Sequence, residues 1–183
     1  MKITYKLIME VFPCRDILEV MGITDEYEAT VPEFINHYCN HMAKIEYLLG
    51  FLCDEKLMSP KDLRLFAVWC VRLIECFLDD KRSINALNVA EKFANEDAVF
   101  QELYNARDLA WCACEECDTF NMPRAAAAST LWFPDDTPCA SVVADYVIKT
   151  AESNKVSLTY EIIDKLLEFF TAKENNEEFS WSD

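Results

Sequence analysis

Glycine is almost absent from this sequence: Gly22 and Gly50 are the only two glycines among 183 residues. Glycine is the residue that adopts a positive φ angle at little steric cost. Glycine-rich phosphate loops, dinucleotide-binding turns and tight two-residue hairpins all require such positions. The sequence therefore lacks the turns on which many β-rich and nucleotide-binding folds depend, and it predicts an all-α fold.

Two clear helix starts support the prediction of secondary structure. Thr30-Val31-Pro32-Glu33 combines a capping box with a proline in the first turn and predicts a helix from Val31 to Met42. Ser59-Pro60 predicts a second start. It precedes apolar residues at helical spacing, namely Leu63, Phe66, Cys70, Leu73 and Phe77. Weaker signals elsewhere bring the total to about eight or nine helices in one bundle.

No Gly/Ser-rich linker interrupts the chain, and its only long polar stretch is Lys173 to Asp183. We therefore predict one helical domain over residues 1–172 and an acidic C-terminal tail over residues 173–183. No stretch approaches the 18 or so apolar residues of a membrane span, and Met1 to Phe12 lacks the apolar run of a signal peptide. Most of the nine cysteines lie in apolar helical patterns. We expect a cytoplasmic protein with free thiols.

Acidic residues outnumber basic ones by 33 to 17, which gives a formal net charge of −16. Residues 1–60, 61–122 and 123–183 carry net charges of −5, −5 and −6, so the acidity belongs to the whole surface. A field of one sign attracts cationic macromolecules and repels nucleic acid. Proteins that bind nucleic acid line their grooves with Lys and Arg. The expected partner is therefore a basic protein, such as a CRISPR effector nuclease or another nuclease.

Carboxylate pairs are the candidate contacts with such a partner. Neighbouring residues on a helix point about 100° apart, which suits a solvated surface better than a shared catalytic proton. We therefore expect no catalytic residues, no cofactor and no metal. The carboxylates predicted to bind the partner are Asp79, Asp80, Glu115, Glu116, Asp118, Asp135 and Asp136.

A metal- or thiol-dependent enzyme is an alternative from another class. His37 and His41 are spaced one helical turn apart, which suits a divalent metal, but a zinc site would need a third ligand. Cys112, Cys114 and Cys117 supply three thiols within six residues, but a continuous helix directs them to different sides. A simpler interpretation is that these cysteines pack at contacts between helices and that some of the thiols remain exposed and can be oxidised.

The segment from residue 63 to residue 111 has a distinctive composition. It opens with Leu63-Arg64-Leu65-Phe66-Ala67-Val68-Trp69-Cys70, continues through Val89-Ala90-Glu91-Lys92-Phe93-Ala94-Asn95 and closes with Arg107-Asp108-Leu109-Ala110-Trp111. It resembles a loosely defined group of Ala- and Trp-rich helical proteins from phages, mobile elements and bacterial genomes, some of which are labelled immunity proteins. The resemblance implies a helical fold and a mobile-element origin, and it carries no catalytic residues.

Charge and resemblance together predict a non-enzymatic inhibitor from a phage or mobile element that acts in the host cytoplasm, such as an anti-CRISPR protein against an effector nuclease. The alternative within the same class is an immunity protein that neutralises a cognate toxin. Within the segment that carries the resemblance, we expect Phe66, Trp69, Cys70 and Leu73 to pack in the core. We also expect Arg64 and Arg72 to pair with acidic neighbours.

Overall fold

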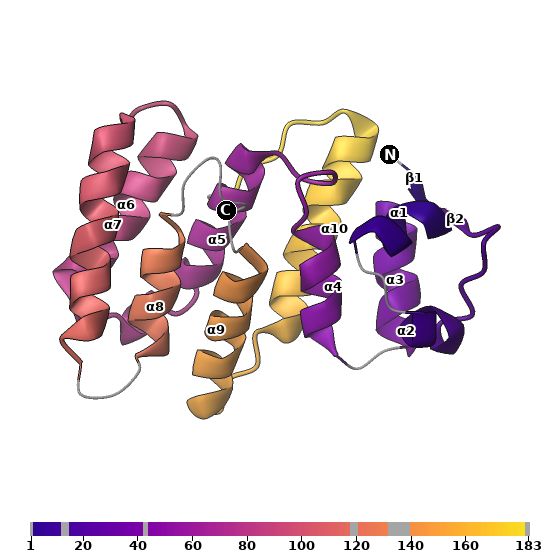
Figure 1. Ribbon diagram of the computed structural model, residues 1–183, viewed down its shortest axis with the longest axis horizontal. Helices are drawn as coiled ribbons and strands as arrows, with labels where there is room; N and C mark the ends of the chain where they lie inside the picture. Colours follow the sequence, from indigo (N-terminus) through magenta and orange to yellow (C-terminus); the bar gives the residue numbers. More distant parts are fainter. Residues whose placement is uncertain (1, 12–14, 42–43, 118–120, 132–139, 182–183) are drawn as a thin grey trace. The chain divides into compact units, whose positions relative to one another are not determined.

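The computed structural model describes residues 2–11, 15–41, 44–117, 121–131 and 140–181. Within these residues it contains ten α-helices, one 3₁₀ helix and a two-stranded sheet (Figure 1). The predicted all-α class is confirmed, with slightly more helices than the sequence indicated. In these ranges no helix combines the length and apolar character needed to cross a lipid bilayer.

The chain divides into two compact units, each described separately below. The first comprises Met1–Asp54 and Thr159–Ser180, and the second comprises Glu55–Leu158 and Trp181–Asp183. The predicted boundary at residue 172 falls inside the last helix, which continues to Asn175. The prediction of a single helical domain followed by a tail stays a prediction.

The first unit joins five helices to a short antiparallel sheet. Its elements are β1 (Lys2–Thr4), α1 (Tyr5–Val11), α2 (Arg15–Val20), β2 (Glu28–Thr30), α3 (Val31–His41), α4 (Ile45–Leu52) and α10 (Thr159–Asn175). Ile3 pairs with Ala29 at the centre of the sheet. Neither strand was predicted, because three residues carry too little periodicity to be recognised.

The start of α3 forms as the sequence predicts. The Thr30 hydroxyl accepts a hydrogen bond from the Glu33 amide at 3.3 Å, and the Glu33 carboxylate accepts one from the Thr30 amide at 2.8 Å. This reciprocal pair satisfies two amides that a helix N-terminus otherwise leaves without partners.

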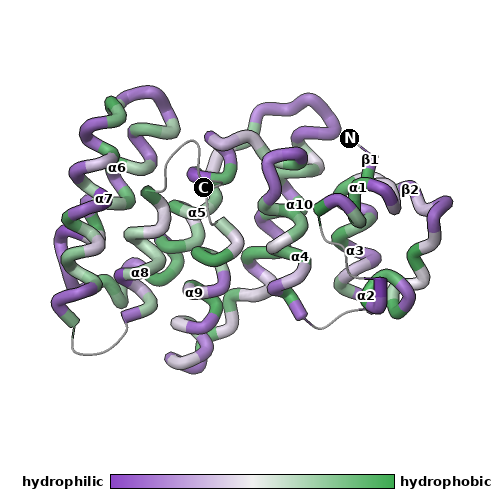
Figure 2. Tube along the Cα trace, in the orientation of Figure 1, coloured by the Kyte–Doolittle hydropathy of each residue, from purple (hydrophilic) through white to green (hydrophobic). Residues whose placement is uncertain are grey.

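The second unit is built from five α-helices. They are α5 (Pro60–Arg72), α6 (Lys81–Ala94), α7 (Phe100–Glu115), α8 (Met122–Ser129) and α9 (Ala140–Ser153), with the 3₁₀ helix η1 (Glu75–Phe77) between the first two. Helix α8 packs against the other four. Ala125 to Ala128 are buried, and their small side chains allow this close approach. Hydrophilic and hydrophobic residues alternate along α6 and α7 (Figure 2), as amphipathic packing requires.

The apolar stripe predicted from Leu63 to Phe77 is shorter in the structure. Leu63, Phe66 and Cys70 are fully buried, but α5 ends at Arg72 and Phe77 lies in η1. Trp69 is half-buried, with its ring stacked on Phe66 at 6.4 Å between centroids. Leu73, the C-cap residue of α5, is also half-buried. The expectation that Trp69 and Leu73 lie in the core is therefore wrong, whereas Phe66 and Cys70 confirm it.

The two arginines of α5 have different environments. Arg72 pairs with Glu75 at 2.7 Å and with Glu91 at 3.3 Å, which confirms the expected acidic partners. Arg64 is only 3% exposed; its Nε donates to the Thr130 carbonyl at 3.3 Å, and its guanidinium lies 5.0 Å from the centre of the Phe93 ring. Burial lowers the pKa of Arg64.

Trp181, near the C-terminus, belongs to the second unit. Its side chain is 7% exposed and lies 5.5 Å from the Phe66 ring between centroids. Its Nε1 donates to Asp62 at 3.4 Å. A buried aromatic residue therefore fastens this end of the chain to α5.

We predict that Trp181→Ala lowers the free energy of unfolding by about 3 kcal/mol, because it removes a buried aromatic ring. Trp181→Phe is the matched control: it keeps part of the apolar contact and loses the Nε1 hydrogen bond, at a smaller cost of about 1–2 kcal/mol. Urea denaturation followed by circular dichroism measures both. Equal stabilities for the Ala variant and the unaltered chain would contradict the observed packing.

We predict that Ser83→Ala stabilises the protein. The Ser83 hydroxyl in α6 is buried and has no hydrogen-bond partner among the described residues, so its removal relieves a desolvation cost of about 1 kcal/mol or more. The control is Ser129→Ala in α8, because the buried Ser129 hydroxyl donates to the Ala125 carbonyl at 2.8 Å. Thermal denaturation should raise the Tm of the first variant and lower that of the second; a lower Tm for Ser83→Ala would show this account to be wrong.

Candidate functional site

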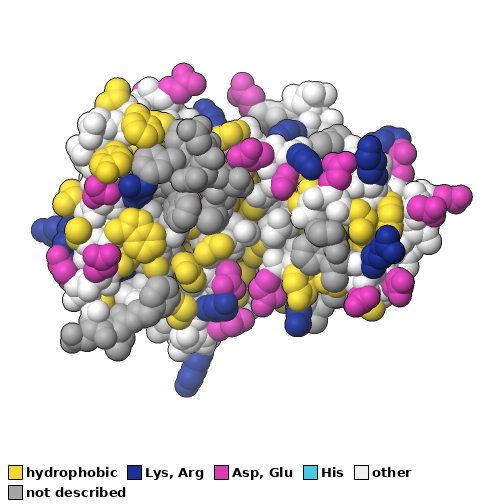
Figure 3. Space-filling view, in the orientation of Figure 1, with side chains coloured by type: hydrophobic (Ala, Val, Ile, Leu, Met, Phe, Trp, Pro, Cys, Tyr) yellow, Lys and Arg dark blue, Asp and Glu magenta, His cyan; other side chains and the backbone are white. Residues whose placement is uncertain are grey.

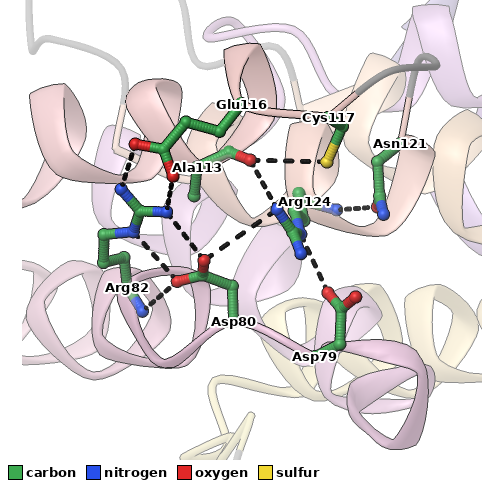
Figure 4. A network of polar contacts seen from close by, with 8 residues as sticks. All are labelled: Asp79, Asp80, Arg82, Ala113, Glu116, Cys117, Asn121 and Arg124. Carbon is green, nitrogen blue, oxygen red and sulfur yellow. Dashed lines mark hydrogen bonds and ion pairs between the residues drawn. The ribbon is translucent and has the colours of Figure 1, made fainter.

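Five charged side chains meet where α6, α7 and α8 come together (Figure 4). They are Asp79 and Asp80 before α6, Arg82 on α6, Glu116 at the end of α7 and Arg124 on α8. We call this set the Arg82–Arg124 cluster. Its members are separated by as many as 45 positions in the sequence, so only the packing of the helices brings them together.

Asp80 is the central acid of the Arg82–Arg124 cluster. As the N-cap of α6, its carboxylate accepts a hydrogen bond from the Arg82 amide at 2.8 Å. The same carboxylate lies 2.8 Å from the Arg82 guanidinium and 3.9 Å from that of Arg124. Arg82 lowers the pKa of Asp80 to about 2, chiefly through their side-chain hydrogen bond.

The outer carboxylates of the cluster each bind one arginine. Arg124 Nε lies 2.8 Å from Asp79, and Arg82 Nη1 donates to Glu116 at 2.9 Å. Both arginines lower the pKa of their partners by hydrogen bonding. Arg124 Nη1 also donates to the Ala113 carbonyl at 2.6 Å, one of the carbonyls near the C-terminus of α7. The cluster therefore ties three helices together.

Four of the seven carboxylates predicted to bind a partner lie in described residues. Asp79, Asp80 and Glu116 belong to the Arg82–Arg124 cluster, where two guanidinium groups neutralise much of their charge. Glu115 is exposed at the end of α7. Asp118, Asp135 and Asp136 lie outside the described residues.

Positive and negative charges differ in their exposure. No carboxylate of the described residues is buried. By contrast, every described arginine except Arg15 is buried or half-buried, namely Arg64, Arg72, Arg82, Arg107 and Arg124. The described lysines are exposed except Lys165, so exposed carboxylates outnumber exposed cationic side chains by 22 to 11 among the described residues.

Both units carry an excess of negative charge. The first has 15 acidic and 6 basic residues, and the second has 18 and 11. Acidic side chains are spread over the face shown in Figure 3 and do not gather in one patch. In the first unit, Glu161, Asp164 and Glu168 are exposed on α10 at positions i, i+3 and i+7, which places them on one helix face. Lys165 approaches Glu168 at 3.8 Å.

An exposed apolar surface on α7 was not predicted from the sequence. Phe100 is 50% exposed, Tyr104 is 40% exposed and Leu109 is 51% exposed. Hydrophobic side chains gather over α6 and α7 in Figure 3. The sequence contained a signal for this exposure. Phe100 and Tyr104 are four residues apart, and both lie outside the helix face on which Leu103 and Ala106 are buried. Phe100 and Tyr104 share one side of α7, whereas Leu109 lies on another side. Exposed aromatic pairs of this kind often mark protein contacts.

The histidines and cysteines singled out by sequence take the following positions. His37 Nε2 lies 2.7 Å from the Met21 carbonyl oxygen, and His41 Nδ1 lies 2.7 Å from the His37 carbonyl oxygen.

Burial raises the pKa of Cys114 to about 11. This is the opposite of the shift that activates a thiolate nucleophile. In the described ranges no three His, Cys, Asp or Glu side chains are grouped to hold a metal ion.

No family model, curated protein or solved structure matches the chain. The resemblance of residues 63–111 to helical phage proteins stays a prediction. A function must therefore be inferred from the residues of this chain and their arrangement.

We predict that Asp80→Asn lowers stability at neutral pH by about 1 kcal/mol, because Asn keeps the N-cap acceptor but loses the charge that binds two arginines. The folded pKa of Asp80, about 2, lies below its usual value near 3.9. The stabilisation is therefore complete above about pH 4 and is lost as the pH falls through 2. Urea denaturation between these pH values should show that acidification lowers the free energy of unfolding less in the variant than in the unaltered chain.

The control for this prediction is Asp80→Ala, which removes both the charge and the N-cap and should cost about 1 kcal/mol more than the Asn variant. An Asn variant that loses stability on acidification as steeply as the unaltered chain would refute the role given to the Asp80 charge.

Proposed function

We propose that the chain is a non-enzymatic inhibitor from a phage or mobile element that binds the basic groove of a host nucleic-acid-handling protein. A CRISPR effector nuclease is the representative partner. One observation carries the proposal: among the described residues 22 carboxylates are exposed, against 11 exposed lysine and arginine side chains. A partner therefore meets a surface on which exposed anions predominate.

The electrostatics favour such a partner. A nucleic-acid groove concentrates Lys and Arg to neutralise phosphates. Along α10, Glu161, Asp164 and Glu168 are spaced about 4.5–6 Å apart at 1.5 Å per residue. A single DNA strand carries about one charge per 3.4 Å, so this helix face offers a comparable row of anions. The rigid helix presents them without the ordering cost of a flexible acidic tail.

Helix α7 supplies contacts of a different kind. The exposed Phe100 and Tyr104 are residue types enriched at protein interfaces. Asp79, Asp80, Glu115 and Glu116 belong to the same unit and remain proposed contacts, together with Asp118, Asp135 and Asp136. In this arrangement carboxylates guide the encounter, and the aromatic side chains add affinity that salt does not screen.

The test is a competition assay. The purified chain is titrated into an effector nuclease that holds a fluorescent DNA duplex, and DNA release and cleavage are both measured. The proposal predicts release of DNA, loss of cleavage and an apparent affinity that falls at least roughly tenfold between about 50 and 200 mM salt. Binding to a nuclease toxin but to no effector would favour the immunity protein, and turnover of a small molecule without such binding would refute the proposal.

Charge variants locate the contact. We expect Glu161→Gln combined with Asp164→Asn to weaken competition several-fold and to reduce its salt dependence, because two anions of the α10 row are lost. The matched control is Asp25→Asn combined with Glu26→Gln, which changes net charge equally at exposed residues of the same unit outside α10. Equal effects of the two pairs would show that only net charge matters and would remove α10 from the interface.

A further inference from the structure

Two half-buried thiols lie three residues apart at the C-terminal end of α7. Cys114 is in the last turn of the helix, and Cys117 follows the C-cap residue Glu116. The Cys117 amide donates to the Cys114 carbonyl at 3.3 Å, which closes one tight turn between the two residues. We propose that Cys114 and Cys117 are a redox-active dithiol, a modification site that closes to an intramolecular disulfide when it meets an oxidised low-molecular-weight disulfide such as glutathione disulfide.

The backbone geometry suits this closure. Residues three apart on a helix have Cβ atoms about 5–6 Å apart, whereas a disulfide needs about 3.5–4.5 Å. The Cβ atoms must therefore approach by only about 1–2 Å. Cys117 lies beyond the last helical residue, so its side chain can make this approach without breaking the ladder of α7.

Cys112 does not share this geometry. It is exposed and lies two residues before Cys114 and five before Cys117. Positions two apart on a helix do not face each other, so the spacing singles out one pair among the three thiols. Cys112 is therefore the natural control for the proposal.

A cation lies beside the more terminal thiol. Cys117 Sγ donates to the Ala113 carbonyl at 3.5 Å, and Arg124 Nη1 donates to the same oxygen at 2.6 Å (Figure 4). Burial raises the pKa of Cys114, which disfavours the thiolate form needed for the first attack. The environment thus assigns the first attack to Cys117 and the second to Cys114.

The reaction consists of two thiol–disulfide exchanges. The Cys117 thiolate attacks one sulfur of glutathione disulfide, the S–S bond breaks, and one glutathione leaves as a thiolate that takes up a proton. The Cys114 thiolate then attacks the sulfur of Cys117 in the mixed disulfide and displaces the second glutathione. Two protein thiols are oxidised, and one glutathione disulfide is reduced to two glutathione molecules.

Oxidation at this site affects the Arg82–Arg124 cluster. The Cys117 S–H no longer donates to the Ala113 carbonyl, which keeps the Arg124 hydrogen bond. The new covalent bond fixes the turn that carries Glu116, the partner of Arg82. The redox state of the dithiol is thereby coupled to the contacts that join α6, α7 and α8.

The test incubates the reduced, full-length chain in glutathione buffers of increasing oxidising strength, blocks remaining thiols with an alkylating agent and maps the peptides by mass spectrometry. The proposal predicts a peptide with a Cys114–Cys117 link that is lighter by two hydrogen atoms and is restored by reductant. Exposed Cys39, Cys76 and Cys112 should carry glutathione adducts only. The unaltered chain gives this result without depending on the folding of any variant.

Single variants then test the order of attack. Cys114→Ser should trap the mixed disulfide at Cys117 and lose the linked peptide completely, Cys117→Ser should also lose it, and Cys112→Ser should retain it. Circular dichroism checks that each variant is folded. The proposal is overturned if the unaltered chain forms only glutathione adducts at Cys114 and Cys117, or if Cys112→Ser abolishes the link.

Discussion

The guanidinium groups of Arg82 and Arg124 hold the second unit together where three of its helices meet. Arg124 binds Asp79 and the Ala113 carbonyl, while Arg82 binds Asp80 and Glu116. Arg124 thereby binds a carbonyl near the end of α7, and Arg82 holds the Asp80 carboxylate that caps the start of α6. The same contacts pair three carboxylates with two cations, so the arrangement that stabilises the helices also neutralises much of the negative charge at this place.

That coupling links the two proposals. Arg82 and Arg124 already engage Asp79, Asp80 and Glu116, so a cationic groove that binds these carboxylates competes with the two arginines. Arg124 also lies beside Cys117, so one side chain takes part in the ion pairs and in the environment of the dithiol. The inhibitor proposal and the redox proposal are nevertheless independent, since one concerns surface carboxylates and the other the chemistry of two thiols.

Much of the fold could be predicted because its signals are local. Thr30 and Glu33 form the expected capping box, and Ser59 accepts from the Asp62 amide at the start of α5, as its place before Pro60 indicated. Trp69 shows the limit of such reasoning: helical spacing gives the face of a helix to which it belongs but not how completely a neighbouring helix covers that face. The site was less predictable from the sequence. Nothing local to Asp79 or Glu116 indicates that Arg124 and Arg82 bind them in the folded structure, so these acids were interpreted as solvated.

By itself, the sequence determined the helical class, several helix starts and the excess of negative charge. Each depends on the composition or on residues within one or two turns of one another. Only the tertiary structure decided which carboxylates are neutralised, which aromatic residues of α7 stay exposed, and which thiol lies beside a cation. Arg82 and Glu116 are 34 positions apart, Arg124 and Asp79 are 45 positions apart, and Arg124 and Ala113 are 11 positions apart. Helix packing brings these groups together.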